Sequence, residues 1–242
     1  MSNDLKFKIS HKITEDNSSN FTIKPLDRGY GITVGNSLRR ALLTAVPGAA
    51  ITNVKIEGAH HEFSTIDGVT EDVADVIMNL KGVRFHLFES SVEPIFLKVK
   101  GPKAFTAADI QAASDDFTIL NPDHYITDIA KGTTLEVELR LGIGKGYKSS
   151  DENKLNNSPV GMIPIDSIFN PVTKVSFNVS PLPGAKEDTE MLSLNVTTDG
   201  SITPIDAVSY CSSVLSEHYN ICLLYTSPSP RDQRGSRMAS CA

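Results

Sequence analysis

Apolar side chains recur with the period of an α-helix between residues 34 and 46. At about 100° per residue they form a stripe roughly 140° wide, which indicates a face that packs against a core or a partner. Gly29, Gly31 and Gly35 lie at the start of this segment, and we expect them to form a sharp turn with positive φ before the helix. The Pro-Gly pair after residue 46 predicts its end. The stripe consists of Val34, Leu38, Ala41, Leu42, Ala45 and Val46.

Two later segments also have helical periodicity. The first spans residues 73–80, with Thr70 as the expected cap and Gly82 just past its end. The second spans residues 204–222, with Thr203 as the expected cap and a proline at the first helical position. Its apolar face is wide enough for more than one packing surface.

Alternation of apolar and polar residues predicts strands in much of the remaining chain. Residues 142–161 are polar and rich in turn formers, so we expect a long exposed loop there. The middle of the chain is therefore expected to be mostly β-sheet. The predicted strands are 5–13 and 21–23, which form a hairpin, then 51–56, 83–87, 95–99, 135–141, 175–179 and 192–196.

Composition and charge favour protein partners over nucleic acid. The chain has 242 residues, of which 40% are hydrophobic and 21% charged, as in an ordinary soluble protein of one or two domains. It has no apolar run of the ~18 residues that span a membrane and no signal-peptide pattern, so we expect a cytoplasmic protein. The net charge is −6, and removing the +2 of residues 223–242 leaves −8, which opposes binding through a broad basic surface.

The search for catalytic, metal and phosphate sites is negative. The sequence has no GxSxG, HExxH or CxxC motif. His60, His61 and Glu62 offer too few ligands for a metal, so a structural or surface role is favoured. The glycine-rich stretches GYGITVG and GIGKGY lack the pattern of a phosphate loop, and tight turns are the better interpretation. We expect no cofactor, no metal and no catalytic site on this chain.

Colinear motifs over roughly residues 5–221 resemble the amino-terminal domain of bacterial DNA-directed RNA polymerase alpha subunits. The motifs are GYGITVGNSLRRALL, PGAAITNVKIEGAHHEFSTIDGVTEDVADVIMNLKGVRF, GKGY, IPIDSIFNPVTKVSFNV and TTDGSITPIDAV. The resemblance implies an α+β fold in which residues 1–49 and 171–222 form a discontinuous dimerisation domain. Residues 50–170 would then be an inserted, mostly β domain.

The resemblance also implies a function in assembly. In that family two alpha subunits form a homodimer, and the dimer is the platform on which the two large catalytic subunits of the polymerase assemble. Arg40 and Leu43 match positions that face the large subunit recruited first, and Lys81 matches another assembly position. Ile165 and Val172 match positions that face the other large subunit. The residues expected in the dimer interface are Val34, Leu38, Leu42, Val208 and Leu215.

Two parts of the chain depart from the family pattern. Residues 181–191, PLPGAKEDTEM, replace a charged stretch that ends in TDxxK, so no contact is carried over there. Residues 223–242 do not resemble the linker and DNA-binding domain that follow in the family. Their composition predicts disorder, and LYTSPSPRD looks more like a translated sequencing adaptor than native sequence. We therefore expect assembly without direct specific contact to DNA.

Two other functions stay open from the residues alone. A single-chain nucleic-acid-binding module would need a basic patch, which the charge of residues 1–222 opposes. A small phosphate-handling enzyme would need catalytic groups that converge on the glycine turn, and the sequence offers none.

Overall fold

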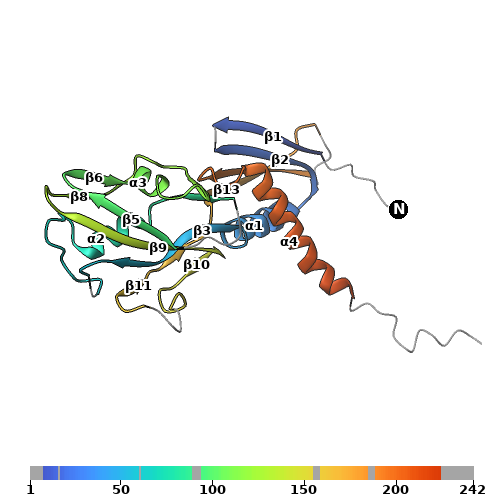
Figure 1. Ribbon diagram of the computed structural model, residues 1–242. Helices are drawn as coiled ribbons and strands as arrows, with labels where there is room; N and C mark the ends of the chain where they lie inside the picture. The colour runs from blue at the N-terminus through green and yellow to red at the C-terminus, as the bar shows by residue number, and fades with distance from the viewer. Residues whose placement is uncertain are drawn as a thin grey trace, which may run out of the picture.

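A four-stranded antiparallel sheet and two helices form one lobe of the molecule, here called the terminal lobe (Figure 1). A computed structural model describes residues 8–15, 17–59, 61–88, 94–154, 159–184 and 189–224. The elements of the terminal lobe are β1 (Lys8–Glu15), β2 (Ser18–Asp27), α1 (Tyr30–Thr44), β13 (Val172–Pro181), β14 (Thr189–Thr198) and α4 (Pro204–Leu224). The strand order is β1-β2-β14-β13, so segments from both ends of the described chain pair at β2 and β14.

Helices α1 and α4 pack against this sheet and against each other. The apolar stripe of α1 is buried against alternate residues of the strands, as its helical period predicts. The terminal lobe therefore has a hydrophobic core of its own, separate from that of the rest of the chain. This core contains Phe21, Leu38, Ala41, Leu42, Val46, Val172, Val175, Leu194, Val196, Ala207 and Cys211.

The second lobe, here called the middle lobe, is mostly β-sheet and is inserted between α1 and β13 (Figure 1). A sheet with the order β5-β9-β3-β4-β7 forms its centre, and β11 also pairs with β3. This arrangement confirms the predicted α+β fold with an inserted β-rich part. The elements are β3 (Pro47–Ile56), α2 (Val73–Leu80), β4 (Phe85–Leu87), β5 (Ile95–Lys100), β6 (Lys103–Thr106), α3 (Ala107–Gln111), β7 (Phe117–Ile119), β8 (Tyr125–Ile129), β9 (Thr134–Lys145), β10 (Tyr147–Lys148), β11 (Met162–Pro164) and β12 (Ser167–Ile168).

Of the three glycines expected to form a turn before α1, Gly29 alone does so. Only Gly29 has a positive φ, of 87°, whereas Gly31 and Gly35 lie inside the helix, which begins four residues earlier than expected. A Cβ on Gly35 would lie 2.6 Å from the ring of Phe177, and one on Gly31 would lie 2.6 Å from Val179. These two glycines therefore serve close packing of α1 against β13, a role that the local sequence does not distinguish from a turn.

The start of α1 is held by a carboxylate from another strand. Glu190 of β14 accepts hydrogen bonds from the backbone N–H groups of Gly29, at 2.9 Å, and Gly31, at 3.0 Å. The helix has no side-chain cap of its own and no acidic residue in its first turn. Glu190 thus satisfies N–H groups at the positive end of the helix dipole, where a negative charge is stabilising.

Replacing Glu190 with glutamine should lower the free energy of unfolding by about 1–2 kcal/mol, because a neutral amide offers one oxygen acceptor in place of two charged ones. Urea unfolding followed by circular dichroism measures this change. Glu62→Gln is the matched control, because Glu62 is exposed. Equal unfolding midpoints for the two variants would show that the cap contributes nothing.

The prediction of a long loop at residues 142–161 is wrong for the first part of this segment. Strand β9 continues to Lys145 and pairs with the start of β3, and residues 147–148 form β10. Gly142 and Gly144 have no side chains, so the alternation that marks a strand is absent from the sequence there. Gly144 is also needed for space, since a Cβ would lie 2.7 Å from the ring of Phe169. Because β3 starts at Pro47, it crosses the domain boundary predicted near residue 50.

The helix caps were predicted with mixed success. The cap of α2 is Asp72, which accepts a hydrogen bond from the backbone N–H of Asp75 at 2.9 Å, so the prediction of Thr70 was wrong. At α4 the predicted cap is confirmed, because Thr203 Oγ1 accepts from the backbone N–H of Asp206 at 3.1 Å.

No helix in the described part of the chain is long and apolar enough to cross a membrane. Residues 225–242, and with them most of the tail expected to be disordered, lie outside the described residues.

Candidate functional site

The five residues predicted to form a dimer interface lie on α1 and α4, which the fold brings together. Val34, Val208 and Leu215 are partly exposed at the edge of the core. Leu38 and Leu42 are 6% and 0% exposed, so they fill the core of their own chain and have little surface for a partner. The sequence pattern shows which residues share a face of the helix, but it does not show where the core ends.

Exposed apolar residues around these helices extend the surface beyond the predicted set. Tyr30 and Ile32 are exposed at the start of α1, and Tyr219 is exposed on α4. A groove of about 640 Å³ lies between β1 and α4 and is lined in part by Ile9 and Val208. The alternation in residues 5–13 predicts a strand, of which residues 8–13 lie in β1, but it does not indicate that Ile9 and Ile13 are exposed. In Figure 1 the second half of α4 runs out past the sheet.

Arg40 and Leu43 lie near the C-terminal end of α1. Arg40 is exposed, as is its neighbour Arg39, and Leu43 is half-buried against the core. The turn between β9 and β10 approaches this end of the helix, since a Cβ on Gly146 would lie 3.5 Å from the carbonyl oxygen of Thr44. The surface around Arg40 therefore borders the middle lobe.

Lys81 follows α2 and forms an ion pair with Asp166, with 3.5 Å between Nζ and Oδ2. The other carboxylate oxygen of Asp166 accepts a hydrogen bond from the backbone N–H of Ser150 at 2.9 Å. This hydrogen bond and the charge of Lys81 hold the pKa of Asp166 below its usual value. Burial, and next the nearby charge of Asp166, raise the pKa of Tyr147. Asp166 was not among the predicted site residues, although it directly follows Ile165, which was predicted, in the motif IPIDSIF.

Ile165 and Val172, predicted to face a large subunit, are each only 3% exposed. Ile165 belongs to the core of the middle lobe and Val172 to that of the terminal lobe. Near them, Tyr147 of β10 and Ile168 of β12 are opposite each other in the register and are both exposed. A partner at this position would therefore touch Tyr147 and Ile168 before it touched the two predicted residues.

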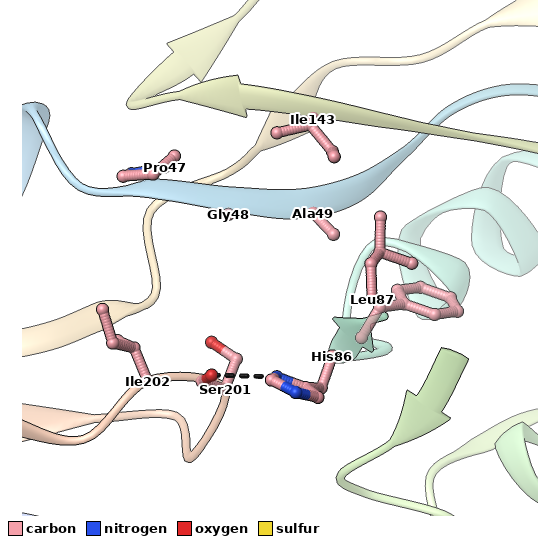
Figure 2. A pocket seen from close by; sticks show the side chains of 9 residues that line it. Pro47, Gly48, Ala49, His86, Leu87, Ile143, Ser201 and Ile202 are labelled. Atoms are coloured by element: carbon pink, nitrogen blue, oxygen red, sulfur yellow. Dashed lines mark hydrogen bonds between the residues drawn. The ribbon is translucent and has the colours of Figure 1, made fainter. Parts of the chain in front are cut away.

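The two lobes meet at a cavity of about 230 Å³, shown in Figure 2. His86 from β4 crosses this joint, and its Nδ1 donates a hydrogen bond to the carbonyl oxygen of Ser201 at 3.0 Å. Apart from His86, none of the residues that line the cavity is titratable. The cavity is therefore a joint between the lobes, with His86 as the titratable group of its lining. Its walls are Pro47, Gly48, Ala49, Phe85, His86, Leu87, Ile143, Ser201 and Ile202.

The candidates for metal chemistry can be placed only in part. His61 Nδ1 and Ser64 Oγ lie within hydrogen-bond distance, at 3.2 Å; His61 is exposed and Ser64 is half-buried. His60 lies outside the described residues. Among the residues that the structure describes, no three His, Cys, Asp or Glu side chains gather as metal ligands would.

Comparison with known proteins assigns the chain to a family. The family described as "RNA polymerase Rpb3/RpoA insert domain" matches residues 54–170, which lie in the middle lobe. Three relatives are each named "DNA-directed RNA polymerase subunit alpha". The relative from Salinibacter ruber is 49% identical over 84% of this chain, that from Chloroherpeton thalassium 44% over 85%, and that from Limosilactobacillus reuteri 46% over 86%.

The matched part of this chain spans 62% of the Salinibacter protein, 63% of the Chloroherpeton protein and 67% of the Limosilactobacillus protein. Identity at this level over both lobes agrees with the split sheet, the inserted β-rich lobe and the order of the motifs. The chain therefore belongs to the family of DNA-directed RNA polymerase alpha subunits.

Proposed function

We propose that this chain is a non-catalytic polymerase subunit that dimerises and serves as the platform on which the two large catalytic subunits assemble. The observation that carries this proposal is the position of α1. Its inner face closes the core of the terminal lobe, while exposed residues at its two ends remain for other chains. The names of the relatives and the family of the insert support a place in the polymerase.

Dimerisation would use the apolar surface around α1 and α4. Val34, Val208 and Leu215 border on the core, and Tyr219 continues the same surface along α4. Burial of a self-complementary apolar face is the usual basis of a two-fold dimer. The groove between β1 and α4 offers space for apolar side chains of the second copy.

Capture of a large subunit would use Arg40 and Leu43. Arg40 is exposed near the end of α1 that borders the middle lobe, and Leu43 beside it keeps part of its side chain accessible. A charged group next to an accessible apolar one is a common arrangement at protein interfaces.

Replacing Arg40 with alanine should weaken capture of the large subunit by about 30-fold or more, because truncating one partner of a buried charged contact costs ~2–5 kcal/mol. Folding and dimer formation should stay nearly unchanged, since Arg40 is exposed in the single chain. Titration of the labelled dimer with purified large subunits measures the capture, and sedimentation velocity measures the dimer.

Arg39→Ala is the matched control, because it removes the same charge from the neighbouring exposed position. Equal losses in the two variants would indicate a general charge effect. Unchanged capture by Arg40→Ala would contradict the proposed contact, and a monomeric wild-type chain at micromolar concentration would contradict the dimer.

A further inference from the structure

Asp166 lies where three segments of the middle lobe meet. The ammonium group of Lys81 contacts it from the end of α2, and the backbone N–H of Ser150 contacts it from the turn after β10. Tyr147 lies near it on β10. Each carboxylate oxygen contacts a different segment, since Oδ1 accepts from Ser150 and Oδ2 pairs with Lys81. The side chain therefore bridges elements that are separate in the sequence.

The backbone around Asp166 is held from inside the lobe. Ile165 and Ser167, on either side, are 3% and 1% exposed. Asn153 donates from Nδ2 to the carbonyl oxygen of Ile165, at 2.8 Å, and to the hydroxyl of Ser167, at 2.9 Å. The hydroxyl of Ser167 in turn donates to the carbonyl oxygen of Ile51 in β3, at 2.7 Å. Asp166 is the more exposed residue between these two buried neighbours. Because hydrogen bonds hold the backbone on both sides of it, the carboxylate of Asp166 is held in one place.

This ion pair has little to contribute to folding. The side chains of Lys81 and Asp166 are 26% and 40% exposed, and pairs this accessible to solvent stabilise proteins only weakly. Ordering a lysine side chain on binding costs conformational entropy. Because Asp166 already holds the side chain of Lys81 in the free subunit, less of this entropy is lost when a partner binds. The ammonium group has three N–H donors, of which Asp166 uses one. Within the described residues the other two donors have no acceptor, which leaves them for another molecule.

We propose that Asp166 is a positioning residue, which holds Lys81 in place so that its ammonium group can donate to a carboxylate or carbonyl oxygen of a large polymerase subunit. Tyr147 and Ile168, which are exposed beside it, complete the same surface. The inference rests on the proposed function, the assembly of the large subunits, and on the expectation from the family resemblance that Lys81 is one of the contacts.

The test compares Asp166→Asn with the wild-type dimer in capture of purified large subunits. We expect about tenfold weaker capture, because the lysine must be ordered on binding. The melting temperature should change little. Asp166→Glu keeps the charge and should restore part of the loss. Asp151→Asn is the control, because Asp151 is a carboxylate in the neighbouring turn that pairs with Lys154 and is 81% exposed.

A double-mutant cycle separates positioning from a general structural effect. Lys81→Met alone should weaken capture, and adding Asp166→Asn to it should cause no further loss, since the group to be positioned is gone. Equal, additive losses in the two backgrounds, or wild-type capture by Asp166→Asn, would overturn the role of Asp166 while leaving the assembly function in place. Unchanged capture by both Lys81→Met and Arg40→Ala would overturn this inference together with the proposed function.

Discussion

Replacing Gly48 with alanine should lower the free energy of unfolding by about 3 kcal/mol or more, since a methyl group there has no space. An added Cβ would lie 1.9 Å from the backbone oxygen of Phe169 and 3.3 Å from Pro171. Gly48 is the second residue of β3, where the chain enters the middle lobe, and Phe169 and Pro171 lie between β12 and β13, where the chain returns to the terminal lobe. The glycine lets these two segments of the chain lie in contact. The clash of an added methyl group would be with a backbone oxygen, which rotation of a side chain cannot relieve.

Gly142→Ala is the comparison variant for this experiment. Its added Cβ would lie 2.7 Å from the side-chain methyl of Thr52, which can move by rotation about χ1. Denaturant unfolding of both variants should give a much lower midpoint for Gly48→Ala. Similar midpoints would show that the joint between the lobes can open by the 1.5 Å that separates the clash at 1.9 Å from an ordinary contact at 3.4 Å.

Replacing Leu42 with alanine should lower the free energy of unfolding by about 2–5 kcal/mol, as expected when a fully buried leucine leaves a cavity. Leu42 has no exposed surface in the single chain and packs in the core of the terminal lobe. If Leu42 acted only in the dimer interface, the same change would weaken dimerisation and leave the monomer as stable as before.

Unfolding at low and at high protein concentration distinguishes these two roles. A core role predicts the same loss at both concentrations, whereas an interface role predicts a loss that depends on concentration, because association stabilises by mass action. Val34→Ala is the matched control, since Val34 is partly exposed on the same helix. We expect it to cost far less than Leu42→Ala in the stability of the monomer.

Periodicity predicted the elements that carry the proposed function. The stripe of α1, the helix α2 and the capped start of α4 are where the sequence places them, because a helix that covers a core must present apolar residues every three to four positions. The same rule failed at residues 142–145, where glycines hide the alternation of β9. It also could not separate Leu42, which is fully buried, from Val34, which lies at the border of the core.

The sequence by itself determined the family, the α+β class and the set of exposed charges that includes Arg40. These depend on local period and on colinear motifs, which are properties of the chain read in order. Only the tertiary structure decided that Glu190 caps α1, that Gly35 makes room for Phe177 and that Asp166 holds Lys81. Each of these pairs is separated by more than eighty residues, and what lies opposite a side chain is set by how the elements pack, which no local pattern records.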